Sequence, residues 1–528
     1  MQVQRAAAGA LRTLAFKNED NKNKIVECGA LPHLVYMVRD ADTNVHYEAV
    51  GVLGNLVHSS PAIKKRVLEE GALQPVIGLL SSPCTESQRE AALLLGQFAT
   101  TVDEQRTSPD YKTRIVQRGA VRPLIAMLSN EDAQLKEMAA FALGRLAQNA
   151  DNQAGICAGG GLKPLLVLLE SRNGSLQHNA AFALYGLADN EDNVAEIIKE
   201  GGVQRLMDGD LISQPSKDCV AKTLKRLEEK VSAKPLQYLL YLLRQGDRPS
   251  AQADREVPRR VAVSLAHLCK EEEMKQIFLE RGGLAILLDM LSVAKPPKEP
   301  PYLASHKEKA EREAAAQREA ARALVRLSEK ANARSPPDCT PAPPDQATVR
   351  LDRAFVNSKQ ASDVTFVVEN RDFYAHRIAL LAASDAFRAM FDGGYRERDA
   401  AKIEIPNIRF AVFEAMMQCV YTGDVTVTAD IAQELLQSAD QYLLEGLKRI
   451  CETAIAEKLT VENLMNVYEL SEAYHAPQLG NMCVLFALEK HTDVIAAHGQ
   501  EAFTHMWQRT TMLQQLRSYM EARALTSL

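Results

Sequence analysis

The chain has 528 residues, of which 46% are apolar and 25% charged, as in ordinary globular proteins. Its net charge of −6 argues against a general affinity for DNA or RNA, because such affinity needs a basic face. There is no apolar run of about 18 residues, so no membrane-spanning helix is expected. The nine scattered cysteines form no C-x-x-C pair and are typical of reduced intracellular thiols.

A glycine-centred landmark recurs about every 40 residues over the first part of the chain. Each copy has a Gly, a short apolar stretch and usually a Pro in its first turn. The copies begin at Gly29, Gly71, Gly119, Gly160, Gly201 and Gly282. The interval after Gly71 contains a polar insertion at 101–113, and the interval after Gly201 spans two periods, with a degenerate unit near 234–243.

An Ala-rich helix runs in phase with this landmark. Such helices are predicted at 6–16, 48–58, 90–100, 138–148, 179–189 and 260–270. Each has apolar residues at helical spacing, and its small residues allow neighbouring helices to approach closely. Because each unit is apolar on more than one side, it must stack on its neighbours.

The residues between the helices fit this interpretation. Gly is suited to a helix break that needs a positive φ, and Pro is suited to the first turn of the next helix. Asn18 and Asp192 are predicted to be helix N-caps.

Over roughly residues 1–330 the pattern resembles the armadillo repeat. Phrases such as NLVHSSPAIKK and HNAAFALYGLADNEDNVA are similar to those of plant armadillo–BTB proteins. The resemblance implies an α-solenoid. Because Met1 falls at the start of a groove-lining helix, we expect that a preceding segment is missing from this chain or that its first unit frays.

The same resemblance implies a peptide-binding groove, in which an Asn of each unit bonds the peptide backbone. The aligned positions are Thr13, Asn55, Gln97, Arg145, Gly186 and His267. Asn55 keeps the family residue and Gln97 is a partial substitute, whereas the Trp ladder of nuclear-import adaptors is absent. Recognition of basic import signals is therefore not expected. Asn55, Gln97 and Arg145 are candidate groove residues, and the alternative is that each simply faces solvent.

The composition changes after the repeats. Armadillo repeats are predicted at 1–291 and an irregular last repeat at 292–331, with a Pro-rich insertion and an Ala/Glu/Arg helix at 307–331. A Pro-rich linker is predicted at 332–350, where the domain boundary lies.

Beyond the linker, alternating β-branched and aromatic residues predict a hairpin at 362–377. A helix at 378–391, a strand at 402–408 and helices at 410–427 and 429–459 are predicted to follow. The motifs SDV, FYAHR, VYTG and ADQYLL resemble those of the BTB domain. The resemblance implies an α+β BTB/POZ domain at 351–459 with a helical extension at 460–528, so that the whole chain is mostly α.

BTB resemblance implies a homodimer and, in a large subset of the family, binding to cullin-3. That subset has a hydrophobic-x-Glu pattern after the helix that ends in Met-Phe, and Tyr395-Arg396-Glu397 fits it. We expect Tyr395 to fill a pocket on cullin-3 and Glu397 to accept hydrogen bonds or cap a helix. The alternative is a solvated loop.

No arrangement of residues indicates catalysis. His376 has no second His or Cys nearby and is predicted to be structural, and Asp363 is expected to be structural or to pack at a BTB dimer interface. Phosphate-binding and H-E-x-x-H motifs are absent. We therefore expect no cofactor, no metal and no enzyme activity.

The sequence is consistent with two alternative functions. The first is a substrate adaptor of a cullin-3 ubiquitin ligase, in which the BTB dimer binds cullin-3 and the armadillo groove binds the substrate. The alternative is a nuclear cofactor without ligase activity, because plant armadillo–BTB proteins are known as partners of abscisic-acid-response and replication-licensing factors. The resemblance implies residence in nucleus and cytoplasm. No direct nucleic-acid or membrane partner is expected.

Overall fold

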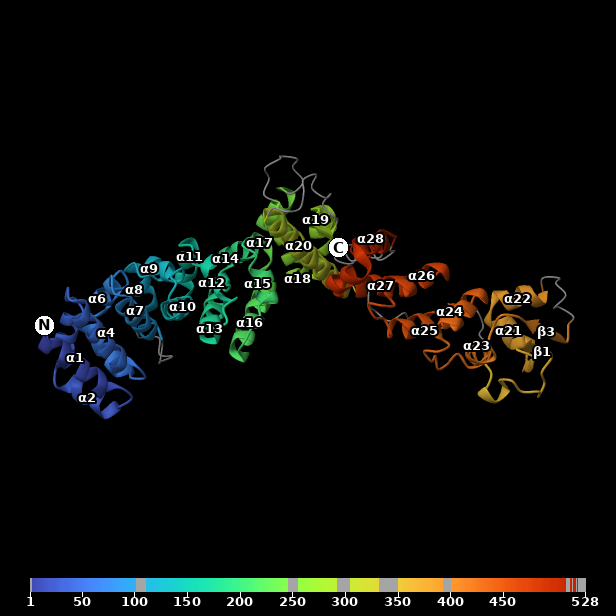
Figure 1. Ribbon diagram of the computed structural model, residues 1–528, viewed down its shortest axis with the longest axis horizontal. Coiled ribbons are helices and arrows are strands. Elements are labelled where there is room, and N and C mark those ends of the chain that lie inside the picture. Colours follow the sequence, from blue (N-terminus) through green and yellow to red (C-terminus); the bar gives the residue numbers. More distant parts are fainter. Residues whose placement is uncertain are drawn as a thin grey trace. The chain divides into compact units, whose positions relative to one another are not determined.

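The computed structural model describes residues 2–100, 111–245, 255–291, 304–331, 350–392, 400–509, 513–514, 516–518 and 520. These form two compact units, one made by residues 1–270 and 280–286, the other by 271–279 and 287–528. Figure 1 shows the helices and strands that make up the two units. The predicted polar insertion at 101–113 and the linker at 332–350 lie almost wholly outside the described residues.

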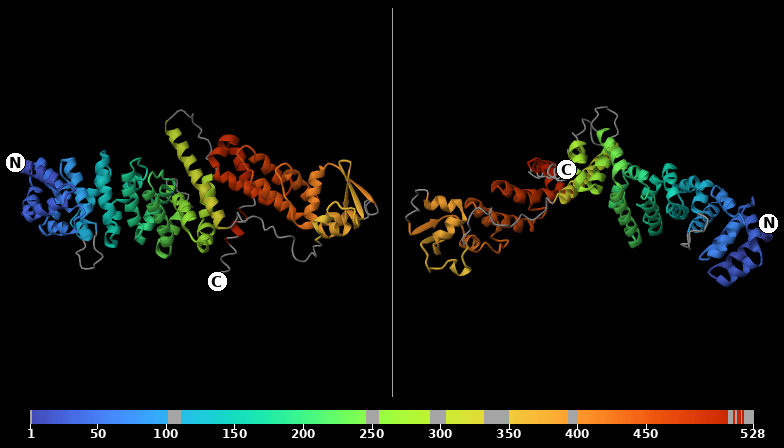
Figure 2. Two further views of the ribbon diagram at one scale, coloured as in Figure 1. Left: turned by 90° about the horizontal axis from the view of Figure 1, so that it is seen from below. Right: turned by 180° about the vertical axis from the view of Figure 1, so that it is seen from behind.

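The first unit is a stack of short helices. One helix of each repeat packs on its counterpart in the next repeat, and we call this set the groove helices. They are α1 (Gln2–Ala15), α4 (Thr43–Val57), α7 (Thr85–Phe98), α10 (Ala133–Leu146), α13 (Gly174–Leu187) and α16 (Gln214–Lys230). Figure 1 and Figure 2 show them following one another in chain order. The repeating stack confirms the predicted solenoid.

The remaining helices lie between the groove helices in the chain or after the last of them. They are α2 (Glu19–Glu27), α3 (Ala30–Met37), α5 (Pro61–Glu69), α6 (Leu73–Leu79), α8 (Tyr111–Gln117), α9 (Val121–Met127), α11 (Ala150–Ala158), α12 (Leu162–Leu168), α14 (Glu191–Lys199), α15 (Gly202–Asp208), α17 (Ala233–Gln245), α18 (Glu256–Leu268) and α19 (Gly283–Leu291).

The core between the groove helices is built from alanines and leucines, such as Ala91, Ala139, Ala180 and Leu143, which are fully buried. Small side chains thus allow the close helix approach that the sequence predicts.

Glycine and asparagine mark the helix ends. All six landmark glycines have a positive φ, for example 74° at Gly29 and 87° at Gly160, as predicted. Asn18 is confirmed as an N-cap, because its side chain accepts a hydrogen bond from the amide of Asn21. The predicted cap at Asp192 is wrong. Asn190 caps α14 instead, and Asp192 lies in the first turn, where its charge favours the helix N-terminus.

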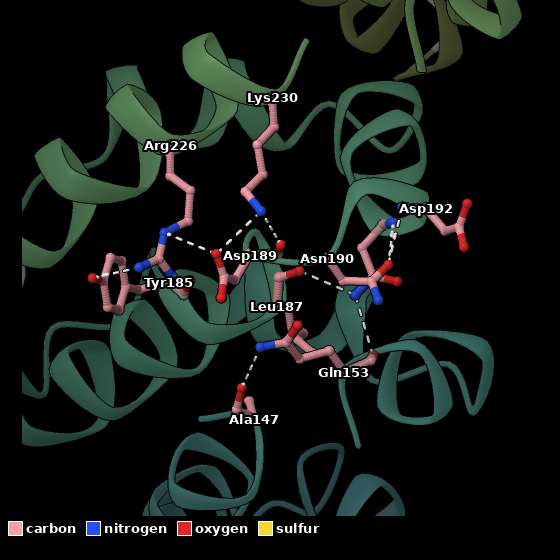
Figure 3. Close-up of polar contacts among 10 residues, drawn as sticks. Ala147, Gln153, Tyr185, Leu187, Asp189, Asn190, Asp192, Arg226 and Lys230 are labelled. Atoms are coloured by element: carbon pink, nitrogen blue, oxygen red, sulfur yellow. Dashed lines mark hydrogen bonds and ion pairs between the residues drawn. The ribbon is translucent and has the colours of Figure 1, made fainter. Parts of the chain in front are cut away.

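Buried amides connect successive repeats. Asn193 of α14 donates to the carbonyl oxygens of Gln153 at 3.2 Å and Leu187 at 3.0 Å, and Gln153 donates to that of Ala147 at 3.1 Å (Figure 3). The bonds to Ala147 and Leu187 satisfy carbonyl groups at the C-terminal ends of α10 and α13, where a helix leaves acceptors without a partner, and the bond to Gln153 joins α14 to α11. They therefore fix the register of one repeat on the next.

One repeat is more regular than the sequence indicates. Between Gly201 and Gly282 a degenerate unit near 234–243 and an Ala-rich helix at 260–270 are predicted, yet α16, which is not predicted, packs on α13 as a groove helix. Few residues of α16 are buried. Among them are Val220, Thr223 and Leu227, and charged residues separate them in the sequence. This weak apolar pattern explains why sequence analysis overlooks the helix.

The BTB region of the second unit begins with a three-stranded sheet of order β2-β1-β3. Strand β1 (Val364–Val368) pairs antiparallel with β2 (Arg371–Ala375) and parallel with β3 (Lys402–Ile405). Glu369 and Asn370 form the two-residue turn between β1 and β2, with φ values of 49° and 56° that are typical of a type I′ turn. The predicted hairpin is confirmed.

Helices cover this sheet and continue to the end of the described chain. They are α21 (Arg377–Ala383), α22 (Asp385–Asp392), α23 (Phe410–Thr422), α24 (Ala432–Gln441), α25 (Glu445–Ala456), α26 (Leu464–Ala473), α27 (Pro477–Glu489) and α28 (His491–Arg509). The long helix α20 (Ala304–Lys330) packs on α27 within this unit. The predicted fold class, an armadillo solenoid followed by an α+β domain with a helical extension, is confirmed. No helix among the described residues is long and apolar enough to cross a bilayer.

His376 joins the sheet to α23 through a closed hydrogen-bond network. Its Nε2 lies 2.8 Å from the carbonyl oxygen of Gln360, so this nitrogen is the donor, and Nδ1 accepts from the Tyr421 hydroxyl at 2.9 Å. The same hydroxyl accepts the backbone N–H of His376 at 2.8 Å. Burial raises the pKa of Tyr421 to about 12, so its hydroxyl stays protonated. His376 thus has a structural role, as predicted.

Tyr421→Phe is expected to destabilise the BTB region by about 1–3 kcal/mol, because it leaves two buried groups of His376 without partners. Hydrogen exchange of the β1 and β2 amides would measure the loss. Tyr374→Phe is the matched control, since Tyr374 is only half-buried. A Tyr421→Phe protein as protected as the wild type would contradict the network.

Candidate binding groove on the helical repeats

The positions aligned with the armadillo asparagine lie on successive groove helices, but their side chains have different surroundings. Asn55 donates from Nδ2 to the carbonyl oxygen of Arg12 at 2.9 Å, so its amide donor already joins α4 to α1. Gln97 is half-buried, and its Oε1 has no partner among the described residues. Thr13 is exposed and donates to the carbonyl of Gly9 in its own helix at 3.1 Å. The structure thus brings Asn55, Gln97 and Arg145 onto three consecutive helices in three different roles.

The first three groove helices share one charge network. Arg12 lies over Gly51, reaches Glu90 Oε1 at 2.6 Å and Glu48 Oε2 at 3.5 Å, and stacks 4.8 Å above the ring of Tyr47. One guanidinium therefore lies between two carboxylates. Both carboxylates and the guanidinium are therefore already paired with one another.

The next part of the groove contains an aromatic pair that sequence analysis missed. Phe141 and Phe182 stand four residues before Arg145 and Gly186, and each lies over a glycine of the preceding groove helix. A Cβ on Gly96 would be only 2.4 Å from the Phe141 ring, and one on Gly144 would be 3.1 Å from the Phe182 ring. A Leu-Gly dipeptide precedes the aligned position in both helices, but the same dipeptide at Leu53-Gly54 has no neighbour within 4 Å of a Cβ at Gly54, so the sequence alone does not reveal these contacts.

Arg145 lies between the two rings. Its Cζ is 5.4 Å from the centroid of Phe141 and 5.1 Å from that of Phe182, which is cation–π geometry. Arg145 has neither an ion pair nor a hydrogen bond with any described residue, and its buried Nε has no partner. A half-buried guanidinium without a carboxylate is available to a partner.

Gly186 has no side chain, and the side chain of Gln148 occupies the space that a Cβ at this position would enter. Gln148 donates from Nε2 to the carbonyls of Gly144 at 3.1 Å and Phe182 at 3.4 Å. A Cβ on Gly186 would lie 2.8 Å from that Nε2 and 2.7 Å from the carbonyl oxygen of Ala147. Gly186 therefore packs directly against the preceding repeat and offers no side chain to the groove.

Figure 3 shows the last part of the groove, where Arg226 and Lys230 of α16 meet the end of α13. Arg226 donates to the carbonyl and hydroxyl oxygens of Tyr185 at 2.8 and 2.6 Å, and its guanidinium lies 3.8 Å from that ring centroid. Asp189 Oδ1 lies 3.6 Å from Arg226 Nε and 3.2 Å from Lys230 Nζ. Two cations share one carboxylate, so positive charge remains in excess. Arg226 occupies the aligned position of α16, which the sequence analysis missed.

Three further positions singled out from the sequence are Tyr395, Glu397 and His267. Tyr395 and Glu397 lie outside the described residues, between the end of α22 and the start of β3. His267 has a partner within the structure. Within the described ranges, no group of three or more His, Cys, Asp or Glu side chains is arranged to hold a metal ion.

Family models match two parts of the chain. The BTB/POZ domain model matches residues 353–459, close to the predicted 351–459, and the armadillo/β-catenin-like repeat model matches residues 18–58. Both matches agree with the folds described above for these segments.

Two curated proteins of Arabidopsis thaliana are similar to the chain. "ARM repeat protein interacting with ABF2" is 57% identical over 61% of this chain and 41% of its own length, and "Armadillo BTB Arabidopsis protein 1" is 49% identical over 55% and 36%. The matched part of this chain thus spans less than half of either relative. Among solved structures, a designed armadillo repeat protein is 22% identical, with a TM-score of 0.39 over 42% of this chain and 92% of its own.

Proposed function

We propose that this chain, which is similar to plant armadillo–BTB proteins, is a substrate-recognition adaptor of a cullin-3 ubiquitin ligase. Armadillo and BTB domains are typical of non-enzymatic interaction proteins, and they imply protein partners and BTB self-association. In the proposed assembly the BTB dimer holds cullin-3 and the groove holds the substrate. Linking two binding modules raises the local concentration of the substrate at the ligase.

The observation that carries the proposal is the joining of two different binding modules in one chain. The armadillo stack presents a groove with an unpaired guanidinium at Arg145, and the BTB domain is a separate fold with its own core. In the segment between α22 and β3, Tyr395 and Glu397 supply the hydrophobic and acidic residues of the cullin-3 pattern.

Binding of the full chain to the N-terminal region of cullin-3 tests this function. The wild type is expected to bind, and Tyr395→Ala/Glu397→Ala is expected to weaken binding about tenfold or more, as loss of a central aromatic anchor does. Arg396→Ala is the matched control, because it lies between the two residues but outside the pattern. Absence of binding by the intact protein would reject the ligase adaptor.

A second candidate is a nuclear cofactor that binds a transcription or replication-licensing factor without ligase activity. It is favoured by the name of the 57% identical relative, which says that this relative interacts with ABF2. Under this proposal the protein resides in nucleus and cytoplasm and acts when cullin-3 is depleted. A partner that is degraded only when cullin-3 and Tyr395 are both intact would contradict it.

A further inference from the structure

We propose that the groove from α10 to α16 binds an extended acidic segment of a partner protein, with aspartate or glutamate side chains next to apolar ones. The residues that would contact it are Phe141, Arg145, Phe182, Lys222 and Arg226, which we call the aromatic–cationic strip. This assignment rests on the proposed function of the groove as the partner-binding face and specifies the chemistry of that partner.

Arg145 is the centre of the strip. The rings of Phe141 and Phe182, at 5.4 and 5.1 Å from its Cζ, hold the guanidinium, and no described carboxylate pairs with it. A planar guanidinium donates two parallel hydrogen bonds to a carboxylate, and one that is already held by stacking loses little further freedom on binding. An acidic side chain would supply the missing counter-charge.

Helix α16 adds further positive charge on the same side. Arg226 and Lys230 share the single carboxylate of Asp189, and Lys222 is exposed four residues before Arg226. Residues four apart lie on one face of a helix, so Lys222 and Arg226 face the groove together. No ion pair of Lys222 is present in the described part of the chain.

The pairing of charges thus changes along the groove. At α4 and α7, Glu48 and Glu90 both pair with Arg12, whereas Arg145 of α10 has no carboxylate partner among the described residues, and Arg226 and Lys230 share Asp189. The half-buried faces of Phe141 and Phe182 can cover apolar side chains, and neighbouring helices lie about 8–10 Å apart. An extended segment, with successive side chains on opposite sides, could therefore meet rings and cations in turn.

Fluorescence anisotropy with the full chain tests this assignment. The probe is a short labelled peptide of alternating Glu and Leu, compared with matched Lys-Leu and Glu-Ser peptides. The Glu-Leu peptide is expected to bind most tightly. Arg145→Gln is expected to weaken that binding about tenfold or more, because a hydrogen bond to a charged group contributes about 1.5–3 kcal/mol.

Arg118→Gln is the control, since it removes one exposed positive charge outside the groove helices and should leave binding within about twofold. Equal binding by wild type and Arg145→Gln would overturn the proposal. Tighter binding of a phosphoserine-Leu peptide that also requires Arg145 would reassign the strip to phosphorylated segments and overturn the carboxylate assignment.

Failure of the acidic assignment can be told apart from failure of the proposed function. No cullin-3 is present in the peptide experiment, so a lack of cullin-3 binding does not affect its outcome. If the Lys-Leu peptide binds best and protects α10 and α13 from hydrogen exchange, the groove still binds partners but the acidic assignment is wrong.

Discussion

Phe413→Ala is expected to lower the free energy of unfolding of the BTB region by about 3–5 kcal/mol, the largest effect of any single change considered. Phe413 is fully buried, and its ring centroid lies 5.3 Å from those of both Phe366 and Phe373. Removing the ring leaves a cavity between the sheet and α23 that rigid neighbours fill only in part.

Hydrogen exchange of the β1 amides during denaturant titration would measure this loss, because a chain of two compact units does not unfold in one step. Leu443→Ala is the control in the same region. Leu443 is 56% exposed, so its truncation should change stability by no more than about 0.5 kcal/mol. A loss below about 1 kcal/mol for Phe413→Ala would show that this aromatic cluster is not close-packed.

Gly186→Ala is expected to destabilise the solenoid by about 1–3 kcal/mol, although alanine normally favours a helix over glycine by about 1 kcal/mol. The new Cβ would lie 2.7 Å from the carbonyl oxygen of Ala147, which belongs to the preceding repeat. Because this oxygen is part of the backbone, the repeats themselves must move apart.

Gly54→Ala is the matched control and should change stability in the opposite direction. Gly54 also lies in a groove helix, but a Cβ there would have no neighbour within 4 Å, so the variant should gain about 0.5–1 kcal/mol. Hydrogen exchange of the amides of the groove helices during denaturant titration measures both changes. Two changes of the same sign would contradict the inter-repeat contact at Gly186.

Much of the architecture follows from local patterns. The landmark glycines, from Gly29 to Gly282, recur at the repeat period because each helix break needs a positive φ, which the structure shows. Alternation around Glu369-Asn370 predicts the hairpin, because side chains on a strand alternate between two faces. Misplacing the cap of α14 at Asp192 instead of Asn190 is an error of two residues, common where several polar residues adjoin a helix start.

By itself, the sequence determines the repeat and the order of the domains, because period and residue type are properties of the chain alone. Only the tertiary structure decides what the positions aligned with the armadillo asparagine can do. The side-chain amide of Asn55 donates a hydrogen bond to the carbonyl oxygen of Arg12. The guanidinium of Arg145, by contrast, lies between the rings of Phe141 and Phe182 without a carboxylate partner among the described residues. Both outcomes depend on groups of neighbouring repeats, about 40 residues away in the sequence. These groups come into contact only because one groove helix packs on the next.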